Sequence, residues 1–213
     1  MPRPKKISDI KPILTNVAQT SHYQVQFGGL PADLMRYLNT RDIDQRFIVE
    51  NAGLLCASAS LPGSSLATAD IRGDFMGVSE KMAHSRIFSD MSLEFYVDSD
   101  YKMLNFLEHW MEFASGGSRD DPTNPGYYYR MRYPSSYKCN RTKIYKFDKD
   151  FSRQIEYTFL GMFPINLSST QVSYQSSDVL RVSASFSYER YIPGSTTSIS
   201  KYNNTSGNRG IRP

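Results

Sequence analysis

MSLEFYVDSDYKMLNFLEHWMEFASGG, at residues 91–117, is the stretch that decides the fold. Its first part alternates apolar and polar side chains, with Leu93, Phe95 and Val97 on one face, and this alternation predicts a half-buried strand. Its second part carries apolar side chains at helical spacing and ends at two glycines, which predicts a helix over residues 101–115. Asp98 to Asp100 predict the cap at the start of that helix.

The predicted helix has two apolar rows and only a narrow polar strip, so most of its circumference is expected to be covered. The second row consists of Met103, Phe106, Trp110 and Phe113. One row can pack on the protein's own sheet, and the other needs a further surface. We therefore expect Phe106, Trp110 and Phe113 to be helix-packing or subunit-interface residues. The alternative is a single large core that covers both rows.

Strand patterns continue on both sides of this stretch. LCASASLPG, at residues 55–63, reads as a small-residue strand that ends in a Pro-Gly turn, and residues 63–85 read as a long hairpin or extended loop. An excursion of that length inside a compact domain is typical of a partner contact. Shorter patterns predict a helix at residues 32–38 and strands at residues 23–27, 46–50, 142–147 and 154–163.

The clearest strand lies at residues 180–188. One of its faces is apolar, and the other is small and hydrophilic. The hydrophilic face consists of Arg181, Ser183, Ser185, Ser187 and Glu189.

These patterns give about six to nine strands and one main helix, which predicts a mainly β fold: an antiparallel β-sandwich or barrel with one flanking helix. We expect an N-terminal arm over residues 1–20, a β domain over residues 21–192 and a flexible Ser/Asn/Gly-rich tail over residues 193–213. The β domain carries insertions at about residues 30–50 and 118–137.

The net charge of +4 is concentrated at the two ends of the chain. Residues 1–11 and 201–213 each carry +3, and the remaining body carries −2. A folded face that grips nucleic acid would place the positive charge on the body. The basic tails are therefore expected to be solubilising or to dock on an acidic neighbour, with tail-mediated nucleic-acid binding as the alternative.

The sequence offers little for catalysis or metal binding. The three histidines and two cysteines have no metal-ligand spacing, and neither a phosphate-binding loop nor a nucleophile elbow occurs. We expect no enzyme activity and no cofactor; a hydrolytic Cys–His pair is the least favoured alternative, because such pairs meet only in the fold. The Tyr/Arg run at residues 127–133 favours a protein interface over a single-stranded nucleic-acid platform.

No window reaches the roughly 18 apolar residues of a membrane helix, and no secretory signal is recognisable. Cys56 and Cys139 are therefore expected to be free thiols.

The order of these segments resembles the tail tube protein family of contractile-tailed bacteriophages, including its baseplate tube-initiator relatives. The resemblance covers about residues 20–192 and rests on the strand at 56–63, the excursion after it, the strand and helix over 86–117, and the late pair at 161–165 and 180–188. It implies a virion protein, assembled in the host cytoplasm, whose six-membered rings stack into a tube inside the tail sheath. DNA would pass through that tube without specific binding, and no membrane would be involved.

A channel for a polyanion should not grip it. We therefore expect the face formed by Arg181, Ser183, Ser185, Ser187 and Glu189 to line the lumen or to contact an adjacent subunit. The additional segments suit a decorated tube subunit or, alternatively, a baseplate protein that initiates or caps the tube. A nucleic-acid-binding module is the more remote alternative.

Overall fold

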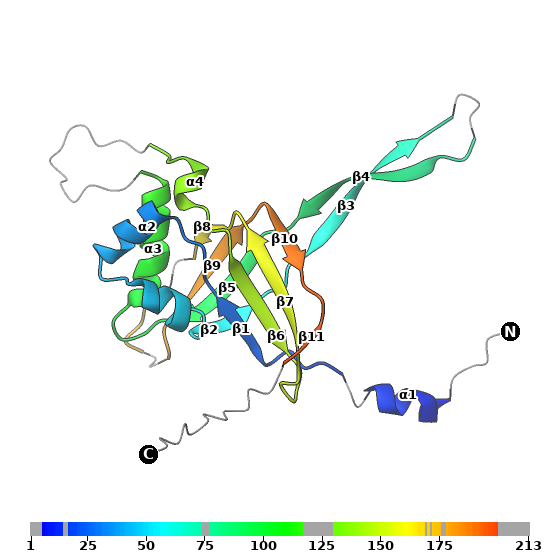
Figure 1. Ribbon diagram of the computed structural model, residues 1–213, viewed down its shortest axis with the longest axis horizontal. Coiled ribbons are helices and arrows are strands. Elements are labelled where there is room, and N and C mark those ends of the chain that lie inside the picture. Colours follow the sequence, from blue (N-terminus) through cyan, green and yellow to red (C-terminus); the bar gives the residue numbers. More distant parts are fainter. Residues whose placement is uncertain are drawn as a thin grey trace, which may run out of the picture.

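The computed structural model describes residues 6–14, 17–73, 77–116, 130–168, 170, 172–175 and 178–199 (Figure 1). Most of its regular structure is β-strand. The strands are β1 (Tyr23–Gln26), β2 (Cys56–Ala59), β3 (Ser64–Ile71), β4 (Glu80–Phe88), β5 (Met91–Tyr96), β6 (Thr142–Phe147), β7 (Arg153–Leu160), β8 (Phe163–Leu167), β9 (Arg181–Ser187), β10 (Arg190–Pro193) and β11 (Thr197–Ser198). The helical segments are α1 (Ile7–Leu14), α2 (Ala32–Asn39), η1 (Phe47–Asn51), α3 (Lys102–Ala114) and α4 (Pro134–Tyr137).

The strands form two antiparallel sheets and a separate hairpin. The first sheet has the order β1-β6-β7-β10, with β11 also paired to β7, and the second has the order β2-β5-β9-β8. The hairpin consists of β3 and β4 alone. The edges β1 and β2 of the two sheets are linked by a hydrogen bond in which the Tyr23 hydroxyl donates to the Cys56 carbonyl at 3.0 Å. The predicted mainly antiparallel β class is confirmed, and the described strands do not close into a barrel.

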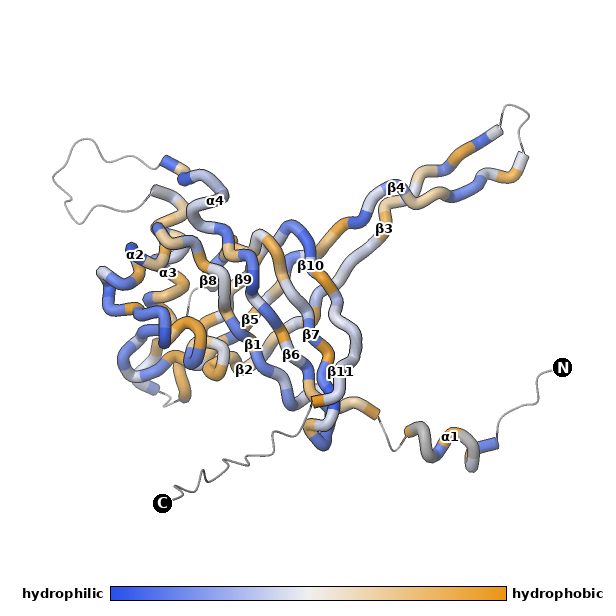
Figure 2. The backbone as a smooth tube through the Cα atoms, in the orientation of Figure 1, coloured by the Kyte–Doolittle hydropathy of each residue, from blue (hydrophilic) through white to orange (hydrophobic). Residues whose placement is uncertain are grey.

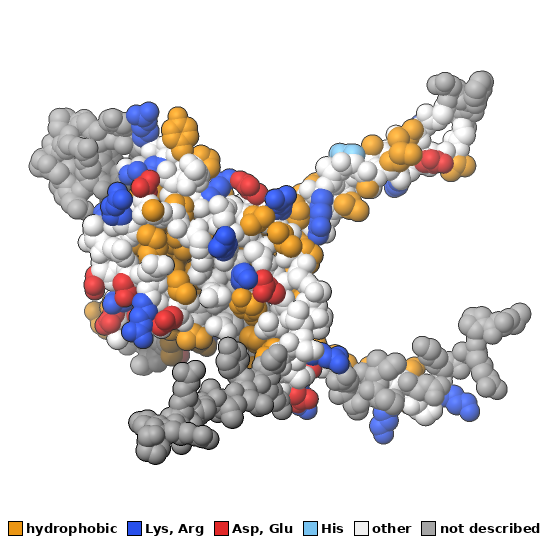
Figure 3. All heavy atoms as spheres, viewed as in Figure 1, with side chains coloured by type: hydrophobic (Ala, Val, Ile, Leu, Met, Phe, Trp, Pro, Cys, Tyr) orange, Lys and Arg blue, Asp and Glu red, His pale blue; other side chains and the backbone are white. Residues whose placement is uncertain are grey.

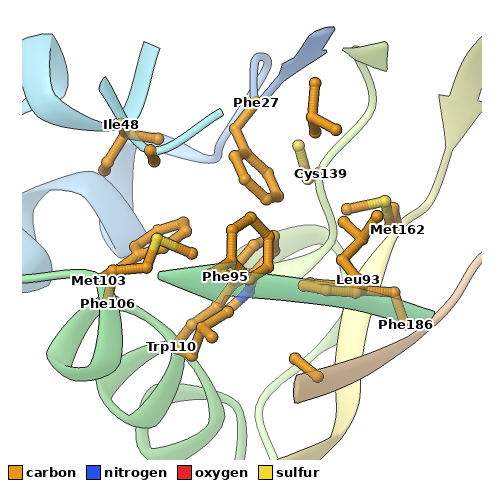
Figure 4. Close-up of a cluster of buried hydrophobic side chains, with 14 of the residues drawn as sticks. Phe27, Ile48, Leu93, Phe95, Met103, Phe106, Trp110, Cys139, Met162 and Phe186 are labelled. Carbon is orange, nitrogen blue, oxygen red and sulfur yellow. The ribbon is translucent and has the colours of Figure 1, made fainter. Parts of the chain in front are cut away.

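An aromatic cluster forms the centre of the core (Figure 4). Phe27, directly after β1, lies 5.5–6.4 Å, between ring centroids, from Phe95 on β5, Phe106 and Trp110 on α3, and Phe186 on β9. All five side chains are completely buried. One ring from the first sheet therefore joins the second sheet to the main helix.

Helix α3 occupies the predicted position, and its start is capped partly as expected. An Asp98 carboxylate oxygen accepts the backbone N–H of Met103 at 3.4 Å. Tyr101, directly before the helix, has a positive φ of 56°, which is uncommon for a residue other than glycine. The helix ends at Ala114. Two residues later, Gly116 has a φ of +94°, which suits glycine, and an added Cβ there would lie 2.2 Å from the Arg130 carbonyl oxygen.

The prediction of a strand at residues 46–50 is wrong, because this segment is helical. An Asp44 carboxylate oxygen accepts the Phe47 N–H at 3.1 Å, as at a helix start, and Arg46 pairs with Glu50 one turn later at 2.9 Å. An apolar run this short does not distinguish a buried strand from a buried helix.

The strand predicted at residues 154–163 divides into β7 and β8. Gly161 separates them with a φ of +67°, and its N–H donates to the Asn140 side chain at 3.1 Å. An added Cβ at Gly161 would lie 2.8 Å from the Glu189 side chain. The chain therefore turns from the first sheet into the second at this glycine.

The hairpin projects away from the body, and α1 stands apart on the same side as the hairpin in the view of Figure 1. The prediction of a long hairpin at residues 63–85 is confirmed. Along the hairpin the tube of Figure 2 alternates between apolar and polar colours. At the other end of the chain, the pairing of β11 extends the first sheet into the predicted tail, of which residues 200–213 lie outside the described part.

Candidate assembly surfaces

The outward face of the second sheet carries the serine row predicted from the sequence. Along β9, Val182, Ala184 and Phe186 are buried, while the serines between them are half-buried. Ser185 lies opposite Ser92 of β5, and Ser183 lies opposite Glu94. The row is therefore a patch of small hydroxyl groups that points away from the protein's own core.

The charged members of the predicted face are paired. Arg181 lies 3.6 Å from the Glu94 carboxylate and stacks over the Tyr96 ring, with 5.1 Å between the guanidinium carbon and the ring centroid. Glu189 lies beyond the end of β9, and its carboxylate accepts a hydrogen bond from Lys138 at 2.8 Å. That bond holds the pKa of Glu189 below its ordinary value. The structure thus leaves the serine row with little unbalanced charge.

The helix residues singled out from the sequence are packing residues of the protein's own core. Phe106 and Trp110 are completely buried, and Phe113 is 2% exposed. The Trp110 indole N–H donates to the Tyr137 carbonyl at 2.9 Å, so α4 closes the far side of the helix. These three side chains are not available to a neighbouring subunit in this conformation. The alternative of a single core that covers both apolar rows describes the structure.

The hairpin carries an apolar face that sequence reasoning did not assign. In its register, Met82 lies opposite Ala69 and Ile87 lies opposite Ser65, so both share a face with Ile71. We call Ala67, Ala69, Ile71, Met82 and Ile87 the hairpin face. Ile71, Met82 and Ile87 are 48–54% exposed, and apolar side chains are visible along the hairpin in Figure 3. The period-2 spacing of these residues was the available signal.

A polar and aromatic cluster holds the base of the hairpin. The Arg86 guanidinium donates to the Tyr191 hydroxyl at 2.9 Å and to the Ser64 hydroxyl at 3.0 Å. The Phe88 ring lies 5.5 Å from the Tyr191 ring, edge to face. These contacts tie β3 and β4 to β10 of the first sheet, so the base of the hairpin is fixed to the body although its length is exposed.

The two cysteines lie in settings that suppress thiolate chemistry. Burial raises the pKa of the Cys56 thiol to about 12, and burial also raises the pKa of Cys139. Cys139 donates to the Gly28 carbonyl at 2.6 Å. Both are free thiols, as expected. Within the described part of the chain, no group of three His, Cys, Asp or Glu side chains is placed to hold a metal ion.

The first three residues of the Tyr/Arg run at residues 127–133 lie outside the described part of the chain, which resumes at Arg130. Of its described members, Tyr133 is 82% exposed and Met131 is 67% exposed. The Arg132 guanidinium lies over the Phe113 ring, 4.1 Å from its centroid.

Among the described residues, no helix is long and apolar enough to cross a membrane.

The family model for the phage tail tube protein matches residues 18–193. The chain belongs to the phage tail tube protein family. The match covers the hairpin, α3 and every strand of the two sheets except β11, and it leaves α1 outside. This tail tube protein is therefore a structural component of a phage tail. A comparison with curated protein sequences gave no match.

Two solved structures have a fold similar to that of this chain. The sheath/tube terminator of an extracellular contractile injection system, PVC, in the extended state is 14% identical, with a TM-score of 0.54 over 84% of this chain and 97% of that one. A chain of the PVC sheath-tube complex in the extended state is also 14% identical, with a TM-score of 0.51 over 92% of this chain and 100% of that one. At these identities the similarity shows a shared fold.

Proposed function

We propose that this chain is a subunit of hexameric rings that stack into the inner tube of a contractile phage tail, with the serine row towards the channel for DNA. The observation that carries the proposal is the combination of a neutral outward sheet face with a family match over residues 18–193. The subunit assembles in the host cytoplasm, and sheath and baseplate proteins are its partners in the virion.

The serine row suits a channel wall for a physical reason. DNA carries about one negative charge per 1.7 Å of its axis, so exposed cations along a wall would bind it and slow its passage. The only cation of the row within β9, Arg181, is paired with Glu94. Hydroxyl groups hydrate the wall without adding charge.

The hairpin face is the second surface used in assembly. An apolar strand pair that projects from the body is stable only when another surface covers it. In a ring of identical copies, the body of a neighbouring copy provides that surface. The fixed base at Arg86 and Tyr191 gives every copy the same hairpin direction, which a closed symmetric assembly requires.

Electron microscopy of the purified full-length protein tests the assembly. Rings or tubes with six-fold symmetry are the expected result, and a particle that stays monomeric at every concentration would contradict it. The copy number in the intact virion then separates a tube subunit, present in many rings, from a baseplate initiator, present in one.

A charge substitution tests the wall. In Ser185→Arg, the rings are expected to form while DNA is retained in a salt-dependent way. Gln24→Arg on β1 is the matched control, because Gln24 is exposed on the other sheet. Equal DNA retention by the two variants would show that the serine row does not line the channel.

A further inference from the structure

Helix α1 exposes an apolar face that the described part of the body does not cover. Ile7, Ile10 and Leu14 are 84%, 38% and 65% exposed, and their spacing places them on one side of the helix. A helix of eight residues is not stable alone in water, because nucleation is costly and isolated helices need about 12–15 residues. Its face therefore requires a partner surface.

A hollow at the start of α3 has the matching chemistry. It has a volume of about 540 Å³ and lies between η1, the turn after it and the segment that leads into α3. Phe47, Leu54 and Leu55 supply its apolar lining, and Leu54 is 68% exposed. Asp44, Asp98 and Asp100 supply acidic groups.

The two cations in the hollow are both engaged with other carboxylates. Arg46 pairs with Glu50 at 2.9 Å, and Lys102 lies 3.8 Å from Asp42. The region is therefore acidic overall. The N-terminal arm has the opposite charge, since residues 1–11 carry +3 with Lys11 on α1 itself.

Two other hollows lie closer to the arm but lack this complementarity. In the one between β1 and β2, Lys146 is the charged lining residue. The one beside β6 and β7 contains Lys146 and Arg153 against Asp148. Neither attracts a basic helix.

The arm of the same copy is badly placed to fill the acidic hollow. Ala18 to Ser21 line the hollow beside β1, so the chain is already laid against the body at Ala18. Four residue steps separate Leu14 from Ala18, which span at most about 14 Å. In Figure 1, α1 lies on one side of the body and η1 with α3 on the other, with the sheets between them.

We propose that the apolar face of α1 docks in the acidic hollow of a second copy of this chain, with Lys11 beside its carboxylates. This inference rests on the self-assembly proposed above and assigns a role to α1, which lies outside the family match over residues 18–193. Each subunit holds the next one through its arm.

Disulfide cross-linking between two single variants tests the contact. Leu14→Cys and Leu54→Cys are made separately in a Cys56→Ser background, with one chain carrying a mass tag, then mixed and oxidised. The mixed dimer is expected at least tenfold in excess of the dimers formed by either variant alone. Leu14→Cys mixed with Gln24→Cys is the control, because Gln24 is exposed on β1, away from the hollow.

Two results would overturn the proposal. One is a mixture with no excess of mixed dimer over the control. The other is an intrachain disulfide in the Leu14→Cys/Leu54→Cys double variant at high dilution, without cross-links between copies, which would show that the arm folds back on its own body.

A charge exchange gives an independent readout. Lys11→Glu alone and Asp100→Lys alone should each lower the cross-linking yield by up to about fivefold, the range of an exposed ion pair. The two substitutions together should restore the yield. Additive losses without rescue would contradict the placement of Lys11.

Electron microscopy of the same samples separates this contact from the proposed function. Rings without the cross-link would disprove the arm contact but would still support the proposed function as a tube subunit. The cross-link without rings would support the arm contact and contradict the ring-forming function.

Discussion

The core around Trp110 and the β3–β4 hairpin bury their apolar side chains to opposite extents. In the core, rings from α3 and both sheets meet and are completely buried. In the hairpin, Leu66, Ile71, Met82 and Ile87 are 48–63% exposed. The same chain therefore contains a body whose apolar surface is covered from within and a projection whose apolar surface is left for another molecule.

The strand edges differ in the same sense. In the body, the edge strand β8 contains Pro164 and a register shift, and the edge strand β10 ends at Pro193. Both features limit pairing with other chains. The hairpin strands are eight and nine residues long and contain no proline. Strands β8 and β10 are thus protected against uncontrolled pairing, whereas the hairpin strands have no proline.

The largest effect on stability is expected in the core. Trp110→Ala removes a fully buried indole and its hydrogen bond to Tyr137, and it should lower the free energy of unfolding by about 3–5 kcal/mol. Denaturant unfolding measures it. Met82→Ala in the hairpin is the matched control and should change that free energy by no more than about 0.5 kcal/mol. Equal losses of unfolding free energy in the two variants would show that the core and the hairpin do not differ in this way.

Substitutions at two glycines should give a smaller difference in stability between the body and the hairpin. A Cβ added at Gly53 would lie 1.7 Å from the Val25 carbonyl oxygen, whereas one added at Gly73 beyond β3 would meet nothing within 4 Å. Gly53→Ala should therefore cost about 1–3 kcal/mol in thermal or denaturant unfolding. Gly73→Ala should stay within about 0.5 kcal/mol. A tolerant Gly53 would show that β1 can move away from residues 52–55.

Acid should weaken the body slightly. The hydrogen bond from Lys143 to Glu156, 2.8 Å long between β6 and β7, lowers the pKa of Glu156 below its ordinary value. The pair stabilises the fold above the ordinary glutamate pKa of about 4.3, and this contribution is lost as the pH falls through the lower folded value.

The contribution of this pair should be below about 1 kcal/mol, because both side chains are 32% exposed and solvent screens them. The free energy of unfolding, measured between about pH 6 and about pH 2, checks this. In the Glu156→Gln variant, the part of the pH dependence that comes from Glu156 should vanish. An unchanged pH profile in that variant would assign the acid sensitivity to other groups.

The smallest effect on stability and a large effect on assembly are expected in the hairpin. The double variant Met82→Ser/Ile87→Ser changes side chains that are about half exposed, so unfolding should shift by less than about 0.5 kcal/mol. Ring formation should be lost because the hairpin face no longer matches an apolar partner surface. Electron microscopy and sizing measure it.

Thr68→Ser and Ala83→Ser, which lie opposite each other on the other side of the hairpin, form the control for this variant. Normal rings from Met82→Ser/Ile87→Ser would show that the hairpin face is not an assembly surface.

Much of the fold could be predicted from local pattern. The strands at β1, β5, β6 and β9 and the helix α3 lie where alternation or helical spacing placed them. The failures come from short or continuous patterns. Residues 46–50 read as a strand, but Phe47–Asn51 form a helix, and Gly161 divides one predicted strand into two. In the first, the apolar run was too short to distinguish a strand from a helix. In the second, the positive φ at Gly161 ended the strand.

The candidate surfaces divide in the same way. The serine row was recognisable because alternation fixes which side chains of a strand share a face. The hairpin face was not assigned, because its apolar residues alternate like those of any half-buried strand. No local pattern states whether a second sheet lies over that strand.

By itself, the sequence determined which side chains of each element share a face, since that depends only on the repeat of a strand or helix. It therefore determined the antiparallel β class, the position of α3 and the serine row. Only the tertiary structure decided what covers each face. Phe27 and Tyr137 close over Trp110 from distant parts of the chain, whereas no described residue covers the hairpin face in this way. Burial depends on long-range packing between elements, and a repeat along one element carries no information about its neighbours in space.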